Sequence, residues 1–264
     1  MTTSPIYPDI HLPFLEKVEL PMVMRIGLKH PSAPALGDVS ATVASELEKS
    51  HRVSGLSDGA KVAVAVGSRG ISSIDQVVKA SIDWLKAQRF FPFIVPAMGS
   101  HGGGTAEGQI EVLAALGITE QTMGAPIEAT MNVVNYGTTS QGVDCFFDKN
   151  AAAADAVLAI NRVKSHTSFD RPIESGLSKL VAVGLGKGRG AMNVHVLGTT
   201  GLSDVLPEMA KISLRESPIF FGLALVENSD KQLVTVEGVE PDDFYDADRR
   251  LLNKAKSLLA KLPF

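Results

Sequence analysis

The 264-residue sequence predicts an α/β fold with a largely parallel or mixed sheet and flanking helices. The main reason is that short β-branched or apolar runs alternate with longer segments whose apolar residues recur at helical spacing. No internal repeat or low-complexity linker divides the chain, although its length alone would allow one large domain or two small ones. We therefore expect a single α/β domain over residues 1–264. Residues 1–37 are rich in proline, which predicts an extended N-terminal arm with an edge strand at residues 16–28.

The order of these segments predicts each element in turn. The strand candidates share short runs of apolar residues: KVAVAV (61–66), PFIVPAM (92–98), DAVLAINRV (155–163), IFFGLALVE (219–227) and QLVTVEGV (232–239). The helix candidates share apolar residues at helical spacing: residues 72–88, 105–117, 202–216 and 242–262. MNVVNYG (131–137) and VDCFFD (143–148) predict a hairpin.

Composition excludes several classes of protein. Lys and Arg number 25 against 29 Asp and Glu, so the net charge of −4 argues against a nucleic acid or an anionic membrane as the main partner. The single cysteine, Cys145, excludes an internal disulfide and a cysteine-based zinc cluster, and we expect it to be buried. The sequence shows no signal pattern, and its longest apolar runs are too short to span a bilayer, which predicts a soluble cytoplasmic protein.

Three loops at strand ends predict the position of a site. GSRGIS follows the first strand, GSHGGGTAEGQ the second, and KSHTSFDRP the third. Ligands of parallel sheets bind beyond the carboxyl ends of the strands. These loops are therefore expected to meet around a ligand.

The glycine-rich loop has two interpretations. Gly102, Gly103 and Gly104 can let backbone N–H groups approach an anion at a helix start, or they can form a tight turn with positive φ. The spacing matches neither a Walker A motif nor a dinucleotide fingerprint. His101, an acid or base near neutral pH, favours the functional interpretation, and Arg69 at the neighbouring strand end suits a carboxylate or phosphate.

The segment 165–195 contains His166, Lys179 and His195. Taken singly, Lys179 and His195 are more simply explained by packing or solvation. No nucleophile elbow is present, which argues against a serine hydrolase.

Together, the motifs GSRG, GSHGGGTAEGQ, KSHTSFDRP…SGLSK and GRGAMNVH resemble the N-terminal domain of the nickel-dependent lactate racemase family, over about residues 61–195. The resemblance implies a nickel pincer nucleotide attached through a thioamide to Lys179, with His195 as the protein ligand of nickel. It also implies a 2-hydroxy acid substrate that is racemised or epimerised by hydride transfer. The resemblance also implies that His101 and His166 are the acid/base pair and that Arg69 binds the substrate carboxylate. The residues implied to contact the cofactor are Ser68, Gly102, Gly103 and Gly104.

The sequence departs from the family pattern in two places. VGSRG replaces the family's D-x-T-R-P, and DRPIESG lengthens the interval between His166 and Lys179. Both changes surround the substrate, so a bulkier or more polar 2-hydroxy acid is as plausible as lactate. The family's second, lid domain is expected to be absent from this chain, which would leave the site open to water and the racemase activity weak or absent.

Two alternatives belong to other functional classes. The chain could be a non-catalytic ligand-binding domain, or a zinc-dependent hydrolase whose metal is held by His101, His166 and His195.

Overall fold

The computed structural model of the protein describes residues 13–15, 18–19, 22–25, 27, 33–68, 70–167 and 170–260. Residues from Pro31 onward form one compact unit, which contains everything discussed below. In the N-terminal unit, a 3₁₀ turn covers Pro13–Leu15. The edge strand expected at residues 16–28 lies partly outside the described residues, and residues 18–19, 22–25 and 27 contain no strand.

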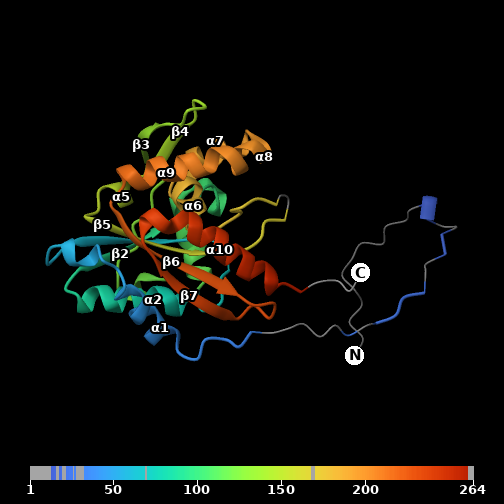
Figure 1. Ribbon diagram of the computed structural model, residues 1–264, viewed down its shortest axis with the longest axis horizontal. Coiled ribbons are helices and arrows are strands. Elements are labelled where there is room, and N and C mark those ends of the chain that lie inside the picture. Colours follow the sequence, from blue (N-terminus) through green and yellow to red (C-terminus); the bar gives the residue numbers. More distant parts are fainter. Residues whose placement is uncertain are drawn as a thin grey trace. The chain divides into compact units, whose positions relative to one another are not determined.

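A five-stranded sheet forms the centre of the fold, in the order β2-β1-β5-β6-β7 (Figure 1). Its strands are β1 (Lys61–Val66), β2 (Phe91–Pro96), β5 (Ala156–Arg162), β6 (Ile219–Glu227) and β7 (Leu233–Val239). The first four in this sequence order run parallel, and β7 pairs antiparallel with β6. The α/β class and all five strands predicted from the sequence are confirmed.

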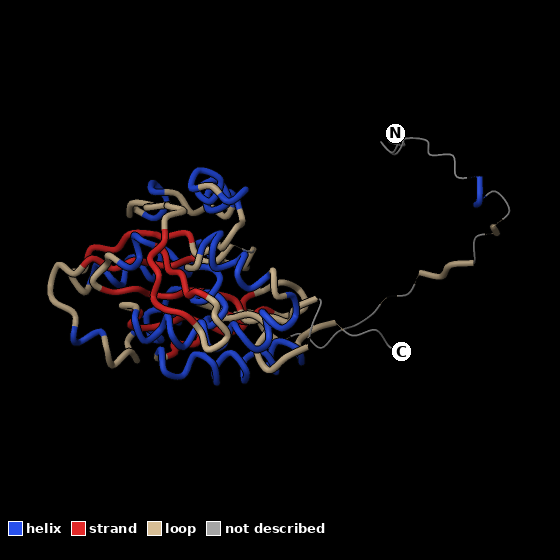
Figure 2. Tube along the Cα trace, turned by 90° about the horizontal axis from the view of Figure 1, so that it is seen from above, coloured by secondary structure: helices blue, strands red, loops and turns tan. Residues whose placement is uncertain are grey.

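Helices cover both faces of this sheet, and Figure 2 shows the strands in the interior among them. The α-helices are α1 (Val39–Leu47), α2 (Ile74–Ala87), α3 (Ala106–Ala115), α4 (Glu120–Met123), α5 (Lys149–Ala152), α6 (Leu177–Lys179), α7 (Lys187–His195), α8 (Gly198–Thr200), α9 (Leu206–Glu216) and α10 (Phe244–Ser257). Two π-helical segments, Leu180–Gly184 and Gly201–Val205, continue α6 and α8. Among the described residues, no helix has both the length and the apolar character needed to cross a bilayer.

The two faces of the sheet carry different side chains, because successive residues of a strand point to opposite sides. The valines of β1 pack with α1, α2 and α3 in one apolar cluster. Ala63 and Ala65 of the same strand belong to the opposite cluster, with Leu177 and Leu180. Small side chains on this face allow the helix that carries Lys179 to lie close to the sheet.

A separate hairpin, β3 (Val133–Thr138) with β4 (Asp144–Asp148), packs on α7 and α9. This hairpin was also expected from the sequence. Cys145, a residue of β4, is fully buried, as predicted, in a third apolar cluster. Burial, followed by the charges of Glu208 and Asp144, raises the pKa of the Cys145 thiol to about 11.

The order of the strands creates a crevice at one edge of the sheet. The chain passes from β1 to β2 on one side and from β5 to β6 on the other, while β1 and β5 are neighbours. The connections that follow β1 and β5 therefore cover opposite faces, which is the arrangement in which parallel sheets bind ligands.

Candidate active site

A cavity of about 200 Å³ lies where the loops after β1, β2 and β5 meet the helix that begins at α6. Five residues expected to act together line this cavity: Ser68, His101, His166, Lys179 and His195. They come from segments up to 127 positions apart in the sequence, so the fold brings them together. Arg69 lies outside the described residues.

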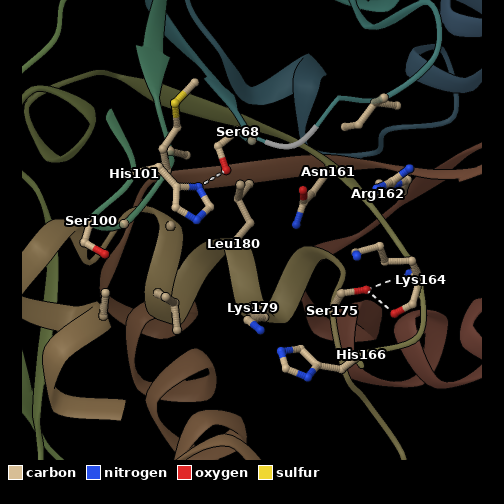
Figure 3. Close-up of a pocket in the computed structure, with 18 of the residues that line it drawn as sticks. Ser68, Ser100, His101, Asn161, Arg162, Lys164, His166, Ser175, Lys179 and Leu180 are labelled. Carbon is tan, nitrogen blue, oxygen red and sulfur yellow. Dashed lines mark hydrogen bonds between the residues drawn. The ribbon is translucent and has the colours of Figure 1, made fainter. Parts of the chain in front are cut away.

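His101 is oriented by Ser68, which comes from the end of the neighbouring strand. The Ser68 hydroxyl and His101 Nδ1 form a hydrogen bond, and Figure 3 shows the pair on one side of the cavity. Gln109 supports the same loop because its Nε2 donates to the carbonyl oxygen of Gly99 at 2.9 Å. Ser68 is thus placed as a partner of the imidazole, while its expected contact with a cofactor stays a prediction.

Gly102, Gly103 and Gly104 do not line the cavity. Their φ angles are +65°, +67° and +69°, a region that favours glycine. A Cβ on Gly102 would lie 2.5 Å from the backbone of Gly108 at the start of α3. The tight-turn interpretation therefore accounts for these glycines, and the structure gives no support to their expected role at the cofactor.

His166 and Lys179 point toward one another across the lower part of the cavity in Figure 3. The loop that carries His166 is fixed by Glu174, whose Oε2 accepts the backbone N–H of His166 at 2.6 Å. Glu174 is buried and forms an ion pair with Lys256 of α10 at 2.6 Å. The segment that lengthens the interval between His166 and Lys179 thus supplies the group that holds the histidine loop.

The helix that carries Lys179 begins on a buried carboxylate from α10. Asp248 accepts the backbone N–H groups of Leu177 at 2.9 Å and Ser178 at 2.8 Å. Gly176 precedes them with φ +113°, and a Cβ there would lie 2.0 Å from Asp248 Oδ1. Burial raises the pKa of Asp248 to about 7, against the lowering effect of these hydrogen bonds. Sequence reasoning missed Asp248 because its only signal was an acidic residue on the apolar face of a helix.

His195, at the end of α7, is an exposed residue that also lines the cavity. Partial burial, and then the positive charge of Lys179, lower the pKa of His195. The imidazole is therefore biased toward its neutral form, which is the form that binds a metal.

A second buried network of polar groups joins the start of α7 to the end of β2 and to α3. Lys187 is fully buried, has φ +54°, and forms an ion pair with the buried Asp148 at 3.0 Å. Its ammonium also donates to Pro96 O at the end of β2 and to Gln109 Oε1 at 3.0 Å. The surrounding sequence, GLGKGRG (184–190), contains a turn at residues 185–186, and α7 begins at this lysine. A glycine-flanked lysine gives no sequence signal that distinguishes a buried amine from a solvated one.

These positions also test the expected zinc site. Within the part of the chain that the structure describes, no three His, Cys, Asp or Glu side chains lie close enough together to hold a metal ion. The zinc hydrolase interpretation needs such a set from His101, His166 and His195.

Comparison with known proteins supports the fold. No protein-family model and no curated protein sequence matches the chain. Among solved structures, the lactate racemase apoprotein from Thermoanaerobacterium thermosaccharolyticum is similar, with a TM-score of 0.60 and 13% sequence identity. The match covers 82% of this chain and 55% of the racemase chain, so this chain corresponds to about half of its neighbour's length. The protein therefore has the α/β fold found in part of lactate racemase.

Proposed function

We propose that this chain is a lactate-racemase-like domain that racemises or epimerises a 2-hydroxy acid with a nickel pincer nucleotide held at Lys179. The observation that carries the proposal is the convergence of Lys179, His195, His101 and His166 on one cavity. The resemblance of the sequence motifs implies the same four residues, and the similarity of fold is consistent with it.

The residues present fit the cofactor in two respects. Lys179 offers an amine for covalent attachment, and His195 offers an imidazole biased toward its neutral form. A metal that is already held by cofactor atoms needs only one ligand from the protein, which agrees with the absence of a cluster of three ligands among the described residues. The cavity of about 200 Å³ suits a small acid, and a nucleotide would have to extend beyond it because ligand pockets usually measure roughly 300–1,000 Å³.

When bound, the pincer nucleotide would supply a hydride acceptor that can also return the hydride. His101 and His166 would move the proton of the substrate hydroxyl: one imidazole would accept it from one enantiomer, and the other imidazole would return a proton to the same oxygen. Such a pair would serve both enantiomers of the hydroxy acid. Ser68 keeps the His101 ring in place, and Glu174 holds the His166 loop.

The test is the intact mass of the chain after co-production with a pincer-cofactor pathway, with nickel assayed in the same sample. We expect a mass increment and about one nickel per chain in the original protein, and neither in Lys179→Ala. Lys211→Ala, on the exposed side of α9, is the matched control and should keep both. An unmodified, nickel-free chain under these conditions would overturn the proposal and favour a non-catalytic binding domain.

A further inference from the structure

The lining of the cavity has a marked imbalance of charge. Its cationic residues are Arg162, Lys164 and Lys179, beside the three histidines, and none of the described lining residues is an aspartate or a glutamate. Such a lining attracts anions, since a cavity walled by one sign of charge concentrates the field of that sign.

The three cations have different surroundings. Arg162 forms an ion pair with Glu227 of β6, which offsets its charge. Lys179 lies beside His166 and is the residue proposed to carry the cofactor (Figure 3). Lys164 lies on the other side of the cavity from His101, and its side chain points inward between Asn161 and Ser175 (Figure 3).

The backbone of Lys164 is held firmly. Its N–H donates to Ser175 Oγ at 2.6 Å, and the same hydroxyl donates to the Lys164 carbonyl oxygen at 2.6 Å. Neighbouring Asn161 is fixed as well, because its Nδ2 donates to Gly176 O at 2.6 Å. A fixed backbone limits the space that the flexible Lys164 side chain can reach, which reduces part of the entropy cost of binding.

We propose that Lys164 binds a second anionic oxygen group of the ligand, in addition to the carboxylate that the reaction itself requires. This deepens the proposed function and rests on it for the identity of the reaction. The group is a carboxylate or a phosphate, and it has two possible sources. It is either a second acidic group on the 2-hydroxy acid or the phosphate of the nucleotide. An ammonium recognises both by the same charge-assisted hydrogen bond.

Binding of four probes to the chain produced without cofactor separates these sources, with isothermal titration calorimetry as the assay. L-malate and L-lactate differ by a second carboxylate, and nicotinic acid mononucleotide and nicotinic acid riboside differ by a phosphate. We expect the member with the extra anionic group to bind more tightly in at least one pair, by about tenfold, which is the usual effect of one hydrogen bond to a charged group.

Lys164→Gln should remove that preference, and Lys164→Arg should retain most of it. Lys211→Gln is the matched control because it removes an exposed lysine far from the lining residues in sequence. Lys164→Met serves as a second neutral variant in case the glutamine variant does not fold. If the variants lose the preference for malate over lactate, the anionic group belongs to the substrate. If they lose the preference for the mononucleotide over the riboside, the group is the cofactor phosphate.

The inference is overturned if the neutral Lys164 variants keep the preference for the probe with the extra anionic group. It is also overturned if Lys211→Gln loses this preference equally, or if no anionic probe binds. These outcomes are independent of the cofactor test. A Lys164-dependent preference in a chain that never acquires nickel would leave anion binding standing and reject the racemase proposal. A nickel adduct on Lys179, together with unchanged preferences in the Lys164 variants, would support the racemase proposal and reject anion binding by Lys164.

Discussion

The buried Asp248 gives the sharpest prediction about stability. Its carboxylate is fully buried and accepts two backbone N–H groups at the start of the helix that carries Lys179. Burial raises its pKa from 3.8 to about 7. The folded protein therefore keeps a proton on Asp248 over a range of pH in which the unfolded chain has already lost it.

The sign of the effect follows from this difference in bound protons. Between pH 3.8 and about 7 the folded state holds more protons at this position than the unfolded state, so the free energy of unfolding falls as pH rises. One proton contributes about 1.4 kcal/mol per pH unit, so Asp248 should lower stability by about 3 kcal/mol between about pH 5 and about pH 8. Above about pH 7 the contribution becomes constant.

Asp248→Asn removes this titration while keeping the shape of the side chain. Its amide NH₂ would face one of the two backbone N–H groups, so we expect a loss of about 1–3 kcal/mol near pH 5 that shrinks or reverses near pH 8. Urea unfolding followed by circular dichroism at several pH values measures both curves. Asp246→Asn is the control, since Asp246 lies on the same helix with a side chain 73% exposed. Parallel curves for Asp248→Asn and the original protein would refute the reasoning.

Three further perturbations test the packing behind the site. Lys187→Met should lower the free energy of unfolding by about 3–5 kcal/mol, because it leaves the buried Asp148 without its cation. Adding Asp148→Asn should restore part of this loss, as measured by urea unfolding. A double variant whose loss equals the sum of the two single losses would contradict the ion pair. Gly176→Ala should destabilise the fold through both its positive φ and a methyl group 2.0 Å from a carboxylate oxygen of α10, and an unchanged melting temperature would contradict this. Cys145 should resist iodoacetamide at about pH 8 in the folded chain, because burial raises its pKa to about 11. In urea the thiol is exposed and should react within minutes. Mass spectrometry measures the labelling, and rapid labelling of the folded chain would contradict this prediction.

Local patterns were sufficient to predict the sheet. KVAVAV and IFFGLALVE are strands whose residues are almost all buried, and such runs are recognisable without knowledge of their neighbours. The rule that ligands bind at the carboxyl ends of parallel strands then selected the loops that carry His101 and His166, and the family resemblance implied the acid/base roles of these two residues. Both line the cavity because the ends of β2 and β5 lie on either side of the end of β1.

The supporting groups were beyond sequence reasoning because their partners lie far away along the chain. Asp248 contacts residues 70 and 71 positions earlier, and Lys187 reaches Pro96, which lies 91 positions earlier. The glycines at 102–104 had two interpretations from the sequence, and their positive φ angles agree with the tight turn, while their contact with a cofactor stays a prediction.

By itself, the sequence determined the α/β class, the strands, the helices α2, α3, α9 and α10, and the residue types able to perform acid/base chemistry, since each depends on local composition and periodicity. Only the tertiary structure decided which of these residues share a cavity and which carboxylate begins the Lys179 helix. It also decided that Lys187, which has glycines on both sides in the sequence, is buried. Burial, and the pKa shifts that follow from it, arise from the whole set of neighbours in space, and no window of sequence contains that set.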